Sequence, residues 1–369
     1  MNGTRGVELH SIHGSFIFPL QKFEDPATGT HPTFFTITGE PETGGFSHRL
    51  AEWACYYTNR MSFREVETLL ERVRGKVLPQ TLHNVVHRVA DDANAMEQQA
   101  VADTVNRPMP PVAARVDVYD PSSKEVLVME DGIVVKAQKP HRGADENRPY
   151  KRVNTDVALI QQPDGEFRFV AQDLSPSGQE TFTISQAIRA EIVRRWSDAD
   201  SPLNIVALSD GASVIRQHLA EAFGVMVTFI LDWYHLTKKL QVLLSQVCHG
   251  NAQRKAVQKD MEHLLWHGDV AGALRILDQV PPRKPDAASD LRGYLTRHAH
   301  EIIDYERRQK AGKPIGSGRV EKGVDQTTGS RQKQKGMSWS PVGSRALGHL
   351  KCVELNGEWE EFWEQRAAA

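Results

Sequence analysis

The segment from residue 113 to residue 236 alternates short apolar runs with amphipathic stretches, and this alternation limits the possible folds more than any other feature. The candidate strands are 112–119, 126–129, 133–137, 153–160, 167–171, 205–208 and 225–231, and the candidate helices are 182–196 and 214–223. Uninterrupted apolar runs such as 205–208 are typical of strands that are buried on both faces. An antiparallel start followed by strand–helix–strand predicts an α/β fold, with a mixed sheet covered by helices.

Composition limits the class of protein. With 369 residues, 40% of them hydrophobic, the chain can bury a substantial core and is expected to form two or three domains. A formal net charge of -2 argues against a uniformly basic nucleic-acid binder, but local basic surfaces remain compatible with it. Cys55, Cys248 and Cys352 are far apart, which disfavours a disulfide framework and a thiolate zinc site. Because there is no secretory signal and no long apolar run, we expect a soluble cytoplasmic protein without a membrane segment.

The N-terminal part divides into two regions. Residues 1–47 are rich in Pro, Gly and Thr, which predicts short strands and turns, and no role is assigned to them. Residues 48–112 are expected to be helical and to end in a linker. Within this region 62–90 matches a helix-turn-helix, opened by a capping box of Ser62 and Glu65. The exposed face of its second helix would carry side chains that can meet bases or phosphates, namely Gln80, Thr81, His83, Asn84, His87 and Arg88. An ordinary helical hairpin with a solvated polar face is the alternative.

The C-terminal part begins with a long helical region. Residues 237–312 are charged and helical, with prolines between their helices, and are expected to form an insertion before residues 313–355 complete the core. Between Arg307 and Lys351 there are eleven Lys or Arg residues against only Glu321 and Asp325. Such a local basic excess suits a phosphate-binding surface, although a merely solvated basic face explains it equally well.

Three acidic residues lie in distinctive contexts. Asp131 and Asp210 are each followed by Gly where an apolar run ends or turns, and Glu321 opens a polar, basic segment with helical character. Two aspartates on strands and a distant glutamate on a helix provide the hard oxygen ligands that Mg²⁺ prefers. Such a site can hold two ions about 3.5–4 Å apart and promote in-line attack on a phosphodiester.

Each acid also has a simpler interpretation. Asp131–Gly132 between two β-rich runs is a strong hairpin-turn signal. Asp210 can equally be the N-cap of the helix that follows it, and Glu321 can be an ordinary helical glutamate. Asp117, in another candidate strand, is an alternative for the first acid. The order of the three acids along the chain therefore carries more weight than any one of them.

The three acids and the motifs around them give the sequence a resemblance to a known family. It resembles bacterial insertion-sequence transposases of the DDE type, in the neighbourhood of the Mutator-like superfamily. The resemblance spans roughly residues 50–350. Its motifs are E-D-G-I-V-V-K at 130–136, L-S-D-G-A at 208–212, L-D-W-Y-H at 231–235, I-G-S-G-R-V-E-K at 315–322 and S-R-Q-K-Q-K-G-M-S-W-S at 330–340. Asp232 and His235 match the Asp-x-x-His signature of that family.

The resemblance implies a ribonuclease-H-like catalytic core, here 113–236, interrupted by the helical insertion. It implies that Asp131, Asp210 and Glu321 hold two Mg²⁺ ions, for which Mn²⁺ can substitute. The implied reaction is hydrolysis at transposon ends, followed by attack of the freed 3′-hydroxyl on target DNA. Asp232 and His235 would position groups near the site.

The same resemblance implies DNA as the partner. The side chains expected to hold the phosphodiester are those flanking Glu321, namely Arg319, Lys322, Arg331, Lys333 and Lys335. Gln80, Thr81, Asn84 and Arg88 of the helix-turn-helix would find the transposon ends. Because two ends must be held together, we expect a dimer or higher homo-oligomer associated with the nucleoid.

Three other interpretations stay open. A ribonuclease-H-like nuclease or resolvase would cut DNA without strand transfer. A domesticated copy would bind DNA without chemistry. A helix-turn-helix regulator with a sensor domain would explain 62–90 but leave the segment around Glu321 without a purpose.

Overall fold

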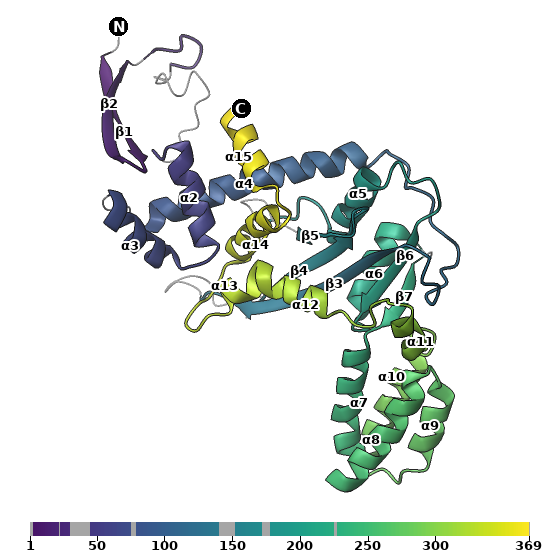
Figure 1. The fold of residues 1–369 in the computed structure, drawn as a ribbon. Coiled ribbons are helices and arrows are strands. Elements are labelled where there is room, and N and C mark those ends of the chain that lie inside the picture. The colour runs from purple at the N-terminus through teal and green to yellow at the C-terminus, as the bar shows by residue number, and fades with distance from the viewer. Residues whose placement is uncertain are drawn as a thin grey trace.

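The computed structural model describes residues 3–21, 23–29, 45–74, 79–139, 152–171, 178–224 and 227–368. At its centre is a five-stranded sheet in the order β5-β4-β3-β6-β7 (Figure 1). The strands are β3 (Glu125–Lys136), β4 (Arg152–Gln161), β5 (Phe167–Ala171), β6 (Asn204–Ser209) and β7 (Thr228–Leu231). β3 pairs antiparallel with β4 and parallel with β6; β4–β5 is antiparallel and β6–β7 is parallel. The predicted mixed α/β sheet is therefore confirmed.

Two local predictions are wrong. The expected strands 126–129 and 133–137 are one continuous strand, because β4 pairs straight across Asp131 and Gly132, so no hairpin turn forms there. Residues 113–119 form a loop instead of a strand, and only Val112 makes an isolated bridge, to Leu203. The carboxylate of Asp117 accepts a hydrogen bond from the Tyr119 backbone N–H at 2.9 Å, which favours a turn over an extended strand.

Helices cover both faces of the sheet. On one face α5 (Ile184–Arg195) and α6 (Ser213–Phe223) pack on the even-numbered apolar residues of β3, such as Val126 and Val128. On the other face α12 (Gly318–Val324) packs on the odd-numbered residues Met129 and Ile133. α14 (Pro341–Leu355) lies beside it over β4 and β5, after the short segments η1 (Asp325–Gly329) and α13 (Ser330–Gln332). Alternation along β3 therefore places Asp131 on the face that α12 covers.

A helical bundle follows β7 directly. It comprises α7 (Trp233–Val247), α8 (Asn251–Trp266), α9 (Val270–Asp278), α10 (Pro285–Arg297) and the short α11 (Tyr305–Lys310). The bundle projects away from the sheet (Figure 1), and its apolar residues continue the core of the α12 face. The expected helical region after residue 236 is present, although its first helix begins at Trp233.

The N-terminal helices pack with the C-terminal ones. α2 (His48–Thr58), α3 (Phe63–Arg74) and α4 (Pro79–Thr104) share a hydrophobic cluster with α14 and α15 (Trp359–Ala368). Ser62 and Glu65 form the expected capping box, with bonds of 2.7 and 3.2 Å. α4 is 26 residues long, because its apolar face continues against α14, and it ends at Thr104 within the region expected to be helical. Before these helices, β1 (Thr4–Ser11) and β2 (Gly14–Gln21) form a hairpin, as expected for short strands.

Cys55, Cys248 and Cys352 are buried free thiols. Within the described part of the chain, we find no helix whose length and apolarity would let it cross a membrane.

Candidate acidic site at the ends of the parallel strands

The strand register aligns two of the predicted acids. Met129 of β3 lies opposite Leu208 of β6, so continuing two residues along both strands brings Asp131 level with Asp210. Residues at one level of neighbouring parallel strands point to the same face of the sheet. Asp131 and Asp210 therefore lie side by side on the face that α12 covers.

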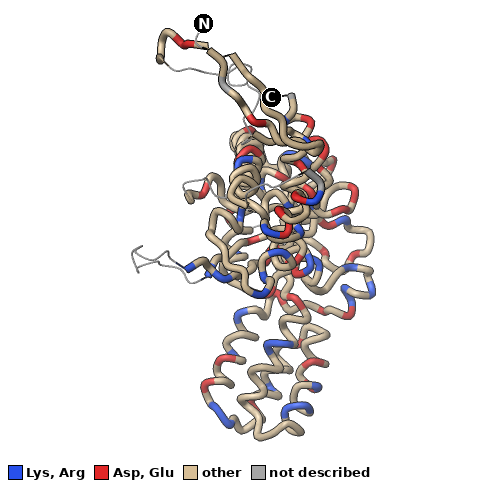
Figure 2. The backbone as a smooth tube through the Cα atoms, turned by 90° about the vertical axis from the view of Figure 1, so that its left-hand side faces the viewer, with Lys and Arg blue, Asp and Glu red and all other residues tan. Residues whose placement is uncertain are grey.

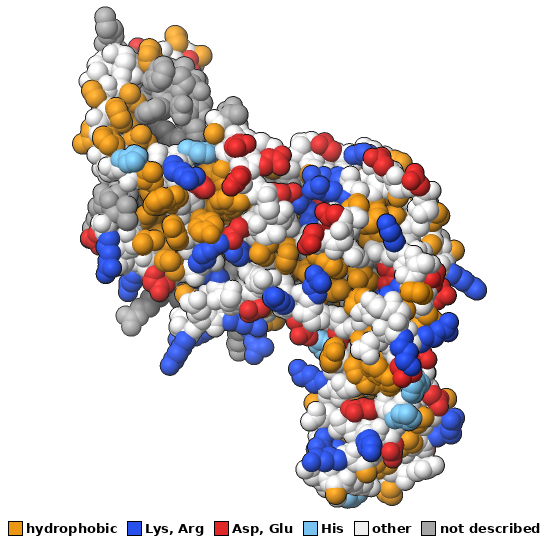
Figure 3. Space-filling model, viewed as in Figure 1, with side chains coloured by type: hydrophobic (Ala, Val, Ile, Leu, Met, Phe, Trp, Pro, Cys, Tyr) orange, Lys and Arg blue, Asp and Glu red, His pale blue; other side chains and the backbone are white. Residues whose placement is uncertain are grey.

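The third neighbouring strand adds Asp232. Ser209 lies opposite Leu231, and the Asp232 backbone N–H donates to the Ser209 carbonyl at 2.8 Å, which continues the ladder by one residue. Figure 2 marks acidic residues along the backbone where the bundle joins the body, and Figure 3 shows acidic side chains at this junction. The carboxyl ends of parallel strands are where open α/β sheets bind ligands.

Asp210 sits in a tight turn. Its carboxylate accepts a hydrogen bond from the Ala212 backbone N–H at 2.8 Å. Because Ala212 is the N-cap of α6, the interpretation of Asp210 as the helix cap is wrong. Gly211 has φ +90°, and a Cβ there would lie 2.9 Å from His298 Cε1 and 3.0 Å from Leu231 Cδ1. Only glycine fits this turn without strain.

Asp232 ties three elements together. It caps α7, where its Oδ1 accepts from the His235 backbone N–H at 2.8 Å. Its Oδ2 accepts from the Ser317 hydroxyl at 2.7 Å and also from the Ser317 backbone N–H. Burial alone would raise the pKa of Asp232, but these hydrogen bonds and the one from His235 lower it to about 2. A buried Asp232 that is ionised at neutral pH thus fixes the start of α12, the helix that carries Glu321.

His235 bridges this anchor to Glu321. Its Nδ1 lies 3.5 Å from Asp232 Oδ1, and its Nε2 lies 3.5 Å from Glu321 Oε1. The hydrogen bond with Asp232 raises the pKa of His235, and the charges of Asp232, Glu321 and Asp210 raise it further against the effect of burial. The acids on either side of the ring therefore stabilise its charged form, and this contact between α7 and α12 fits the expected positioning role.

The three predicted acids influence one another. Burial raises the pKa of Asp131, and the negative charges of Asp210 and Glu321 raise it further, while the Gly132 N–H and His235 oppose the shift. Glu321, with a side chain 53% exposed, is the least constrained of the three. Among the described residues, no three His, Cys, Asp or Glu side chains lie close enough together to enclose a metal ion.

A neighbouring ion pair was not expected from the sequence. The Arg216 guanidinium of α6 donates to Glu301 Oε2 at 2.7 Å, and His298 Nδ1 lies 2.9 Å from the same oxygen. His298 also packs under Gly211, so the chain leaving α10 supports the Asp210 turn. Arg216 lies far from His298 and Glu301 in the sequence, so no local sequence pattern predicts that they interact.

The Lys and Arg residues expected to bind DNA differ in how exposed their side chains are. Lys322, Lys333 and Lys335 are exposed, and exposed Arg319 stacks over Phe167 at 4.5 Å. Arg331 is buried and donates to the Thr58 carbonyl at 2.6 Å, so its assignment to DNA is wrong. Burial lowers the pKa of Arg331 to about 10.

The helix-turn-helix residues lie on α4, away from the acids (Figure 1). Gln80, Asn84 and Arg88 are exposed and Thr81 is half-buried, while the intervening apolar residues are buried. Gln80 donates to Asn84 at 2.9 Å. Their role in DNA binding stays a prediction.

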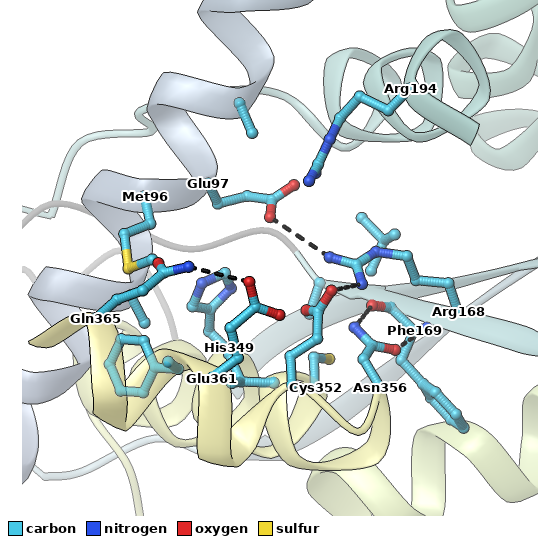
Figure 4. Close-up of a pocket in the computed structure, with 17 residues that line it drawn as sticks. Met96, Glu97, Arg168, Phe169, Arg194, His349, Cys352, Asn356, Glu361 and Gln365 are labelled. Carbon is cyan, nitrogen blue, oxygen red and sulfur yellow. Dashed lines mark hydrogen bonds and ion pairs between the residues drawn. The ribbon is translucent and has the colours of Figure 1, made fainter. Parts of the chain in front are cut away.

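A cavity of about 180 Å³ lies elsewhere, between α4, β5, α14 and α15 (Figure 4). Buried Arg168 crosses its wall and pairs with Glu97 at 4.0 Å, with Glu191 at 2.7 Å and with Glu358. These pairs join α4, α5 and the turn between α14 and α15 to β5, so we interpret this cluster as a structural brace.

Comparison with known proteins identifies no family for this chain. No protein-family model matches the sequence, and no curated protein matches it. Among solved structures, the chain is similar to one described as the Drosophila P element transposase strand transfer complex, at 11% identity and a TM-score of 0.27. That match covers 86% of this chain and 81% of the other, but a score this low supports no argument about fold or function.

Proposed function

We propose that this protein is a DDE-type transposase that cleaves DNA at transposon ends and joins the freed 3′-hydroxyl to target DNA. The observation that carries the proposal is the alignment of Asp131 with Asp210 on adjacent parallel strands, facing the helix that bears Glu321. We further propose that the mixed sheet is of the ribonuclease-H-like kind, with α7–α11 as its insertion.

The donor set fits Mg²⁺ in chemistry. Asp131, Asp210 and Glu321 offer only carboxylate oxygens, and Asp131 is held beside two like charges without an Arg or Lys partner among the described residues. A hard cation relieves that repulsion. Exposed Glu321 is the ligand with the most freedom to close the remaining gap. When bound, Mg²⁺ would supply the charge that activates the attacking oxygen and stabilises the leaving one.

The neighbouring residues position Glu321. Asp232 holds Ser317 at the start of α12, and the His235 Nε2 faces the Glu321 carboxylate. His235 lies beside Glu321 and limits the range over which this exposed carboxylate moves, which would keep it within reach of Asp131 and Asp210. We propose this orienting role for both residues and no direct metal contact.

DNA is the proposed substrate and partner, because exposed basic residues flank the acids. Arg319 and Lys322 lie on α12 itself, two residues before and one after Glu321. The exposed polar face of α4 is proposed to bind transposon ends, with two protomers holding the two ends.

The test is excision and integration from a donor plasmid carrying the DNA that flanks this gene. Mg²⁺-dependent joined products are expected from the intact protein and Asp117→Asn, but not from Asp131→Asn or Asp210→Asn. If Asp131→Asn retained activity, the first catalytic acid would be a residue other than Asp131. Cleavage without joining would instead support a nuclease, and binding without chemistry a domesticated DNA-binding protein.

A further inference from the structure

Two basic residues face each other directly at the far end of β3. Lys136 and Arg152 are cross-strand partners in the antiparallel β3–β4 ladder, and both are exposed. Directly opposed residues point to the same face with their Cβ atoms about 4.5–5.5 Å apart, and like charges in this position destabilise the sheet. The fold therefore bears a local repulsion that a bound anion would remove.

Further cations lie on the segments that adjoin this pair. The backbone N–H of Trp339 donates to the Lys136 carbonyl at 2.9 Å, and Ala137 bridges to Trp339, so the loop after α13 runs along the end of β3. That loop carries exposed Lys333 and Lys335, and exposed Lys139 follows β3. Lys and Arg residues are visible at this end of the molecule in Figures 2 and 3.

These five residues (Lys136, Lys139, Arg152, Lys333 and Lys335), here called the basic end, show no ion pair or hydrogen bond from their side chains within the described part of the chain. This contrasts with Arg60, Arg308 and Lys313, which are each paired with a carboxylate. Cations from β3, β4 and the adjoining segments, left without a carboxylate partner among the described residues, match a backbone of closely spaced phosphates.

We propose that the basic end is a second DNA-backbone contact, separate from the acidic site. This inference rests on the proposed function and adds Lys136, Lys139 and Arg152 to its DNA-binding surface. Asp131 and Lys136 lie on opposite faces of β3, separated along the strand by five residues, or about 17 Å. That span is about five base pairs of duplex, so the basic end holds DNA that flanks the reacting phosphodiester.

The experiment measures binding of the full chain to a fluorescent duplex in EDTA, across a range of salt concentrations. Without divalent metal no chemistry occurs, so the outcome is independent of whether the protein proves to be a transposase. In Lys136→Gln/Arg152→Gln the slope of log K against log salt should flatten by about 1.8, since each lost phosphate contact removes about 0.9. At 0.1 M salt this corresponds to about 60-fold weaker binding, if the two lines meet near 1 M.

The matched control is Arg115→Gln/Lys124→Gln, which removes one exposed Arg and one exposed Lys before the opposite end of β3. For this control, the slope of log K against log salt should equal that of the intact protein. The loss should be equal for the flanking DNA and an unrelated duplex, because phosphate contacts carry no sequence information. Lys136→Arg/Arg152→Lys should bind normally. An unchanged slope in the Gln pair, an equal change in the control, or no duplex binding by the intact protein would each overturn the proposal.

A stability measurement separates binding from misfolding. Arg152→Glu replaces the repulsion with an attractive cross-strand pair, so without DNA its melting temperature should rise while duplex binding falls. A fall in both would indicate that Arg152 is structural and would contradict the proposal.

Discussion

The Arg168 brace and the acidic site each gather three carboxylates, but only the brace has a buried arginine that pairs with all three. Although burial alone would lower the pKa of Arg168, its ion pairs with Glu191, Glu358 and Glu97 raise it. At the acidic site, Arg216 acts on Asp210 and His235 acts on Asp131 and Glu321, but within the described residues no Arg or Lys forms an ion pair with any of the three acids. Carboxylates that are neutralised within the fold stabilise it, whereas carboxylates left in excess are available to an external cation.

The largest difference should follow from removing the brace's cation. Arg168→Met leaves the three glutamates without their common partner, and breaking a buried pair in this way costs about 3–5 kcal/mol of unfolding free energy. Urea unfolding measures it, with Arg319→Met, an exposed arginine, as the control. A loss below 1 kcal/mol, on the order of a surface pair, would mean that the cluster is not a brace.

Divalent metal should stabilise the acidic site and leave the brace unaffected. At a Mn²⁺ concentration about 100-fold above its Kd, the intact protein should gain about 2.7 kcal/mol. Asp210→Asn should lose most of this gain, while the exposed loop variant Asp117→Asn keeps it. Thermal unfolding with and without Mn²⁺ measures the effect, and equal gains in all three proteins would count against metal binding by these acids.

Asp232 should contribute stability with a defined pH dependence. Its folded pKa of about 2 lies below the ordinary 3.8, so its contribution is present above pH 3.8 and is lost as pH falls toward 2. The shift corresponds to about 2 kcal/mol. Asp232→Asn should therefore be less stable at pH 7, with a difference that shrinks below pH 4.

The control for Asp232 is Asp269→Asn, which removes the charge of the N-cap of α9. Asp269 accepts from the Gly272 N–H at 2.7 Å, and its other partner is the exposed Arg275 at 3.8 Å rather than a buried group like Ser317. The substitution should cost only about a few tenths of a kcal/mol, because Asn caps a helix almost as well as Asp. Equal losses in the two variants would show that the bonds to Ser317 add nothing to the cap.

The smallest expected change in unfolding free energy is that of Asp131→Asn, and it is a gain rather than a loss. Asp131→Asn removes a carboxylate that is partly buried beside two like charges, so metal-free stability should stay level or rise by up to about 1 kcal/mol. Urea unfolding in EDTA measures it. A loss of several kcal/mol would instead place Asp131 among the structural carboxylates.

Local patterns predicted most of the sheet but not its pairing. Runs such as 167–171 and the capping box at Ser62 depend on neighbours in the chain, and the structure has them as expected. Asp131–Gly132 has the sequence of a turn, yet cross-strand pairing with β4 keeps it extended. A tertiary ladder here outweighs a local preference.

The misjudged side chains depend on contacts between distant segments. Arg331 has the local setting of a surface cation, and its burial follows from the Thr58 carbonyl, which is 273 residues away. The bonds from Ser317 to Asp232 and the glutamates around Arg168 likewise join separate elements. Composition and periodicity carry no information about such pairs.

The bundle leaves and re-enters the body at one place. Trp233 begins α7 immediately after β7, and on return the Glu301 carbonyl accepts from the Leu231 N–H at 3.0 Å while the Tyr305 hydroxyl donates to the Leu231 carbonyl at 2.8 Å. A unit whose two ends meet can be enlarged, shortened or exchanged during evolution without rethreading the strands. The bundle is thus a replaceable module, and descendants of this chain can diverge there in size while keeping the same sheet.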